Sequence, residues 1–118
     1  MIYGRWIPLG EAQPPSGPGL LQVRYGQGSQ GLIAYPRGKS AMLYYGADDH
    51  ELGDELGRVL EMGRRYGAET GSLWVRFAAP DKNRAPSDTI AESRRGFAAM
   101  FGHEPLWNHD QTNASSRG

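Results

Sequence analysis

The sequence contains no cysteine, which excludes disulfide bonds, thiol catalysis and metal sites with sulfur ligands. Histidine is scarce as well, and His50, His103 and His109 lack the spacing of a histidine-based zinc site. No apolar run approaches the roughly 20 residues that span a bilayer, and no charged segment followed by an apolar one opens the chain. We therefore expect a cytoplasmic protein that makes no membrane contact.

Net charge is also lacking. Thirteen basic side chains balance thirteen acidic ones among the 118 residues, so no overall field attracts nucleic acid or an anionic membrane. The cations are eleven arginines and only two lysines. Arginine suits bidentate contacts with carboxylate or phosphate, although a biased genome composition explains the same excess.

The composition that is present predicts one folded domain. Hydrophobic residues make up 38% of the chain, and 17 glycines and eight prolines indicate many turns. Residues 1–18 hold four of these prolines, so we expect an extended N-terminal segment anchored by Trp6. Residues 19–108 are expected to form the single domain, and the polar residues 109–118 a disordered tail.

Three short strands are predicted near the start of this domain. Residues 19–25 alternate between two sets of side chains, as a strand does, and residues 32–35 and 40–45 follow after glycine-rich turns. Because the three segments are close in sequence, we expect an antiparallel meander, with Tyr44 and Tyr45 on a central strand of the sheet.

Two amphipathic helices and one more strand follow. Residues 51–66 place their large apolar side chains on one stripe, residues 71–79 alternate as a strand, and a second helix begins at Ser87 or Asp88 and ends at Gly102. The order predicts an α+β fold: a small antiparallel sheet, made of the meander and one later strand, with two helices packed on it. The side chains expected to be nearly buried are Leu56, Leu60, Val75, Phe97 and Phe101.

The acidic run at Asp48, Asp49 and Glu51 has two interpretations. Its oxygens are suitable metal ligands, but acids at the first turn of a helix also cap it and complement its dipole. Capping is the expected role.

A second set of residues suggests a known family. Tyr44-Tyr45-Gly46 ends an apolar strand, and a helix, a strand and a helix carrying Glu92 follow, then Pro105-Leu106-Trp107-Asn108. In this order, over most of residues 19–108, the chain resembles the GIY-YIG nuclease superfamily. The resemblance implies a GIY-YIG-like fold in which Glu92 holds a divalent metal such as Mg²⁺, Tyr44 serves the attacking water or the scissile phosphate, and Asn108 helps to arrange the site.

Two positions depart from that pattern. The first motif should read Gly-X-Tyr, but Gly19-Leu20-Leu21 has no hydroxyl at its third position, and Tyr35 is the nearest substitute. The position of a phosphate-stabilising arginine holds Glu55, with Arg58 three residues later as a replacement. These changes predict an eroded active site. Its candidate catalytic residues are Tyr44, Arg58, Glu92 and Asn108, with Glu92 as the metal ligand.

Each candidate also fits an ordinary structural role. Tyr44 and Tyr45 are common strand residues, residues 89–92 match a capping box in which Glu92 bonds the backbone, and Asn108 suits the cap of a turn.

Three functions stay open at this point. The expected one is a weak or inactive nuclease relative that contacts DNA or RNA. The second is an active divalent-metal-dependent endonuclease or phosphodiesterase, and the third is a protein-interaction or accessory domain that has kept only the fold. The candidate nucleic-acid contacts are Arg24, Arg37, Lys39 and Tyr45.

Overall fold

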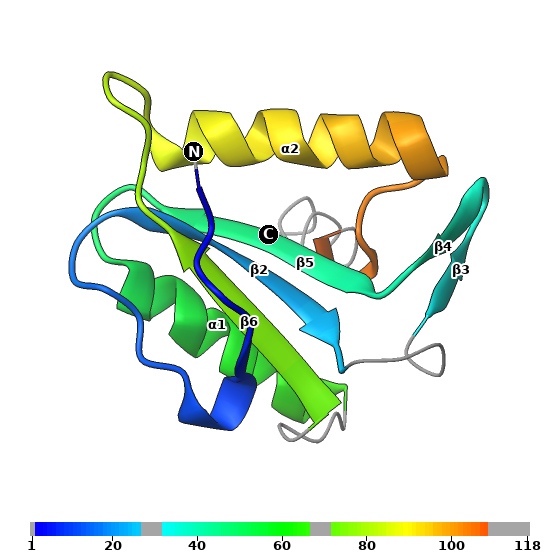
Figure 1. Ribbon diagram of the computed structural model, residues 1–118, viewed down its shortest axis with the longest axis horizontal. Coiled ribbons are helices and arrows are strands. Elements are labelled where there is room, and N and C mark those ends of the chain that lie inside the picture. The colour runs from blue at the N-terminus through cyan, green and yellow to red at the C-terminus, as the bar shows by residue number, and fades with distance from the viewer. Residues whose placement is uncertain (1, 27–31, 67–71, 109–118) are drawn as a thin grey trace.

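The computed structural model describes residues 2–26, 32–66 and 72–108. Figure 1 shows a twisted sheet with helix α1 on one face and helix α2 on the other. In chain order the elements are β1 (Ile7–Pro8), a short 3-10 helix η1 (Leu9–Glu11), β2 (Gly19–Tyr25), β3 (Ile33–Tyr35), β4 (Gly38–Ser40), β5 (Met42–Asp48), α1 (Leu52–Arg65), β6 (Leu73–Ala78) and α2 (Pro86–Phe101). None of the helices in these ranges is long and apolar enough to cross a membrane.

The main sheet is antiparallel, in the order β1-β6-β2-β5, so the predicted α+β class is confirmed. The predicted meander is wrong in one respect, because β3 pairs with β4 in a separate two-stranded ribbon. In chain order the ribbon comes between β2 and β5, and it extends away from the end of the sheet (Figure 1). The strand that carries Tyr44 and Tyr45 was expected at the centre of the sheet, but β5 is an edge strand, since β6 takes the other side of β2.

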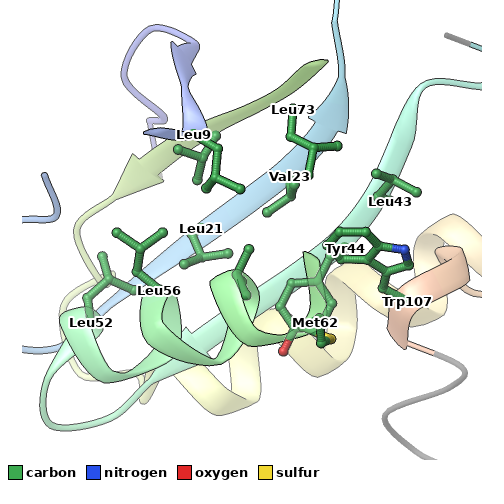
Figure 2. Packing of buried hydrophobic residues seen from close by; sticks show 12 residues of the cluster. Leu9, Leu21, Val23, Leu43, Tyr44, Leu52, Leu56, Met62, Leu73 and Trp107 are labelled. Atoms are coloured by element: carbon green, nitrogen blue, oxygen red, sulfur yellow. The ribbon is translucent and has the colours of Figure 1, made fainter. Parts of the chain in front are cut away.

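The larger part of the core lies between the sheet and α1. Leu21 and Val23 of β2 face Leu56 and Met62 of α1, as Figure 2 shows. Burial of such side chains is the main force that holds a helix on a sheet. The buried residues of this cluster are Leu9, Leu21, Val23, Leu43, Tyr44, Leu52, Leu56, Val59, Met62, Leu73, Val75 and Trp107.

The N-terminal segment is part of this sheet and not an appendage to it. The Gly4 amide donates to the Phe77 carbonyl at 2.8 Å, Ile7 pairs with Val75 in β6, and the Leu9 side chain is buried in the core. Residues 4–9 thus pack against β6 and the core of the domain. The predicted tail, residues 109–118, lies outside the described residues.

Helix α2 covers the opposite face of the sheet. It begins at Pro86, one residue before the predicted start, with Pro at the first helical position where its missing N–H costs nothing. Asp49, from the loop before α1, accepts bonds from the Ser87 amide at 2.9 Å and the Ser87 hydroxyl at 2.8 Å. The helix ends at Gly102 as predicted, because the left-handed backbone there (φ 82°) suits glycine.

The predicted core is right at three of its five positions. Leu56, Val75 and Phe97 are buried, but Leu60 is 37% exposed and Phe101 is half-buried. Leu60 lies beside the buried stripe of α1, about 100° around the helix from Val59. Phe101 is in the last turn of α2, at the end of the helix.

Candidate functional site

Tyr44 lies on the α1 side of β5 and is buried. Its hydroxyl donates to Oε1 of Glu55, which is itself buried on α1. Burial, and then the charge of Glu55, raises the pKa of Tyr44 well above its usual range. The phenol therefore stays protonated, and in this state it cannot accept a proton from an attacking water.

Arg58 continues the chain of contacts from Glu55 to Asp48. Its Nε donates to Glu55 Oε2 at 2.8 Å, and its Nη2 donates to Asp48 Oδ2 at 2.8 Å. We call Tyr44, Asp48, Glu55 and Arg58 the Tyr44 network. Two carboxylates in it oppose one guanidinium, so Arg58 is already neutralised and has less capacity for a phosphate.

The pKa values of the two carboxyl groups in the Tyr44 network are shifted in opposite directions. Burial raises the pKa of Glu55, although Tyr44 and Arg58 act against this shift. The backbone amide of Glu51 and the Arg58 side chain lower the pKa of Asp48 to about 2. Asp48 Oδ1 also accepts the amides of His50 and Glu51, which precede α1, at 2.8 Å each. The N-cap of α1 is Glu51, whose side chain accepts the Gly53 amide, so within this acidic run the predicted capping role belongs to Glu51.

Gly46 has a packing role beside this network. A Cβ built on it would lie 2.6 Å from Glu55 Oε1 and 2.6 Å from Cε2 of Tyr44. Both atoms belong to side chains held by their mutual hydrogen bond, so neither can yield easily. The Tyr-X-Gly spacing at the end of β5 is therefore accounted for by packing alone.

Replacing Gly46 by alanine should lower the free energy of unfolding by about 1–3 kcal/mol, the usual cost of overpacking a core. Gly57→Ala is the matched control, because a Cβ there meets nothing within 4 Å on the exposed side of α1. That change should stabilise the helix by up to about 1 kcal/mol. Urea unfolding measures both, and equal effects of the two substitutions would contradict the packing role.

Glu92 is separated from the Tyr44 network by the sheet. It is on α2, with 60% of its side chain exposed, and its Oε2 pairs with Arg84, which lowers its pKa. It is not part of a capping box either, because the N-cap of α2 is Ala85 and Thr89 lies within the first turn. Within the ranges that the structure describes, no three His, Asp or Glu side chains are grouped as metal ligands.

Asn108 closes part of the free edge of β5. Its Oδ1 accepts the Tyr45 amide and its Nδ2 donates to the Tyr45 carbonyl, each at 2.8 Å. The side-chain amide thus takes the place of a neighbouring strand. Of the four predicted catalytic residues, Tyr44 and Arg58 meet through Glu55, Asn108 binds the backbone next to Tyr44, and Glu92 lies apart.

The predicted nucleic-acid contacts do not form one surface. Arg24 and Tyr45 are on the α2 side of the sheet, where the Tyr45 ring packs against Phe97 with centroids 5.7 Å apart. Arg37 and Lys39 are on or beside the β3–β4 ribbon, and Arg37 Nη1 donates to the Ala99 carbonyl at the end of α2.

Arg24 belongs to a cluster that the sequence alone did not reveal. The Arg24 guanidinium carbon lies 4.4 Å from the ring centroid of Trp6, and that of Arg76 lies 4.5 Å from the same centroid. Arg76 also lies 4.8 Å from the ring centroid of Tyr3. Trp74 is the partner of Arg24 in the register between β2 and β6. We call Tyr3, Trp6, Arg24, Trp74 and Arg76 the arginine–aromatic face.

The two guanidinium groups of this face lack acidic partners. In the described part of the chain, the carboxylates pair with Arg58, Arg64, Arg84 or Arg94, and none pairs with Arg24 or Arg76.

Their own hydrogen bonds are few. Arg76 Nε donates to Gln22 Oε1 at 2.7 Å, whereas Arg24 Nε is buried and makes no hydrogen bond within the same part of the chain. A buried donor without a partner costs free energy that an added acceptor would recover.

Part of the arginine–aromatic face had a signal in the sequence. Arg24, Trp74 and Arg76 occupy the non-apolar positions of two alternating strands, and those strands are neighbours. Tyr3 and Trp6 had no such signal, because they come from a segment whose only strand has two residues.

Comparison of the chain with protein-family models, with curated proteins and with solved structures finds no match.

Proposed function

We propose that this domain binds nucleic acid without cleaving it, and that the arginine–aromatic face makes the contact. The observation that carries the proposal is the pair of guanidinium groups on one Trp6 ring, with no carboxylate partner among the described residues. Uncompensated arginines favour an anionic ligand, and arginine matches phosphate oxygens with two donors at once. Aromatic rings on a sheet add stacking surface for bases.

The position of this face supports the proposal further. Helix α2 packs mainly against β5, so it leaves the arginines of β2 and β6 half-buried and not enclosed. Zero net charge is no obstacle, since the relevant charge is local and six of the thirteen acids are grouped between Asp48 and Glu61, around α1.

The absence of cleavage is supported by the surroundings of the predicted catalytic residues. Leu21 stands where the family pattern has a hydroxyl, Nε and Nη2 of Arg58 are engaged by Glu55 and Asp48, and Glu92 is on the other side of the sheet from Tyr44. Stabilising the charge of a phosphoryl transition state requires donors aimed at one point.

Neutralising Arg24 or Arg76 should weaken oligonucleotide binding at least about tenfold, because each substitution removes a phosphate contact. The measurement is fluorescence anisotropy with labelled single-stranded and duplex oligonucleotides, using Arg24→Gln and Arg76→Gln. Wild-type affinity should fall steeply as salt rises from about 50 to 200 mM. Arg64→Gln is the matched control, since its side chain is 77% exposed on α1.

Two results would contradict the proposal. One is the absence of binding to any oligonucleotide at low salt, and the other is binding that ignores both salt and the two substitutions. The same samples, incubated with Mg²⁺ or Mn²⁺, should show no cleavage. Turnover that Glu92→Ala abolishes would instead establish the metal-dependent nuclease.

A further inference from the structure

We infer that the ligand of the arginine–aromatic face is single-stranded nucleic acid, with its phosphates bound by Arg24 and Arg76 and an adjacent base stacked on Trp74. This inference rests on the proposed function and specifies its ligand. It follows from three features of the face: the gathering of the two arginines at Trp6, the half-buried ring of Trp74, on which no other described ring stacks, and the hydrogen bond that already engages Gln22.

The two guanidinium groups gather at one aromatic ring, where both can contact the phosphates of one bound strand. Both lie within 4.5 Å of the centroid of the Trp6 ring, which holds them in place by cation–π contact. Tyr3 packs against Arg76 as well, and Gln22 Oε1 accepts a hydrogen bond from Arg76 Nε. The Nη atoms of Arg24 and Arg76 donate to no other residue in the described ranges, so they can bind a phosphate without breaking an existing bond.

Trp74 supplies the stacking surface next to this phosphate position. It faces Arg24 across the β2–β6 register and Pro8 across the β6–β1 register. Its ring is half-buried, and no aromatic ring or cation among the described residues stacks on it. Trp6, by contrast, already contacts two guanidinium groups. A base beside the bound phosphate would therefore stack on Trp74 rather than on Trp6.

Stacking on Trp74 separates single strands from duplexes. A base inside a duplex is covered on both faces by its neighbours, so its π-face is available only after unstacking and unpairing, which costs free energy. A single strand has already lost that pairing. The arginines alone would accept either form, so Trp74 is the residue that gives the preference.

The face offers little means to read a sequence. Gln22, the amide side chain beside the arginines, is held by Arg76, and stacking accepts any base. Single strands of different sequence, DNA or RNA, are therefore expected to bind with similar affinity.

The test compares a labelled single strand of about 12 nucleotides without self-complementarity with the blunt duplex of that strand and its complement, by anisotropy at low salt. The wild type should bind the single strand at least about tenfold more tightly, with quenching of tryptophan fluorescence. Trp74→Ala should remove that preference, and Trp74→Phe, which keeps a stacking ring, should retain much of it while reducing the quenching. Circular dichroism checks that each variant is folded.

The outcomes separate this inference from the proposed function. Duplex binding as tight as single-strand binding, or a preference that survives Trp74→Ala, would overturn the single-strand assignment and leave nucleic-acid binding intact. Failure of both oligonucleotides to bind at low salt would overturn both.

Discussion

Replacing Phe97 by alanine should lower the free energy of unfolding by about 3–5 kcal/mol, the range for removing a buried aromatic side chain. Phe97 is 6% exposed and is the centre of an aromatic cluster under α2. Its ring centroid lies 5.1 Å from that of Tyr35, 5.7 Å from that of Tyr45 and 4.5 Å from that of Phe101. Alanine would leave a cavity that these rings can fill only in part.

The measurement is denaturant unfolding at equilibrium. Met100→Ala is the control on the same helix, because Met100 is 68% exposed, and its effect should stay within about 0.5 kcal/mol. A loss below about 1 kcal/mol for Phe97→Ala would show that α2 does not rest on the sheet through this face.

Several elements were predictable from the sequence because their patterns are local, whereas β1 and β4 were not predicted as strands and β5 covers Met42–Asp48 in place of the predicted residues 40–45. The alternation in residues 19–25 predicts a strand with the bounds of β2, and the apolar stripe in residues 51–66 predicts α1 to within one residue at each end. Leu60 marks the limit of this reasoning. Its place near the stripe suggested burial, but only the shape of the sheet decides which side chains at the margin of a helix are covered.

The contacts that define the two candidate sites are not local. Asn108 bonds Tyr45, 63 residues away, and Trp6 contacts Arg76, which comes from the far end of the domain. Such pairs depend on how the strands dock, and one sequence has no pattern for them. The pairing order of β1, β6 and β2 is what brings Trp6 to the arginines.

Glu55 has structural partners that the family pattern does not predict. By the family pattern it is an acid where a phosphate-stabilising arginine belongs. In the structure it is the partner of Tyr44, and it also binds Arg58, so one carboxylate accounts for three of the positions that the pattern singled out. Local packing thus gives Tyr44 and Gly46 a reason to be present that does not depend on catalysis.

Replacing Tyr44 by alanine should cost about 3–5 kcal/mol, because it removes a buried ring and the donor to a buried carboxylate. Tyr44→Phe keeps the ring and removes only the hydroxyl, so it measures the contribution of the hydrogen bond to Glu55. Its expected cost is about 1–2 kcal/mol near neutral pH, the range for a hydrogen bond to a charged group after some relaxation. Denaturant unfolding of both variants separates packing from the hydrogen bond.

The pH dependence identifies the partner of that hydroxyl. The pKa of Glu55 is raised in the folded state, so between its ordinary value and the raised value the folded protein binds more protons than the unfolded one, and stability falls as pH rises from about 4.5. The Tyr44 hydroxyl opposes this rise in pKa. Tyr44→Phe should therefore raise the pKa of Glu55 further, and cost more at about pH 8 than at about pH 4.

Glu55→Gln provides the decisive background, since a neutral amide has no such titration. In that background the penalty of Tyr44→Phe should be nearly the same at both pH values. Asp48 interferes little, because its lowered pKa of about 2 gives stability that is present at about pH 8 and is lost mainly below about pH 4, in both backgrounds alike. A Tyr44→Phe penalty that changes with pH even when Glu55 is replaced would mean that the hydroxyl acts through a different ionisable group, and that the Tyr44 network does not hold β5 against α1 through this bond.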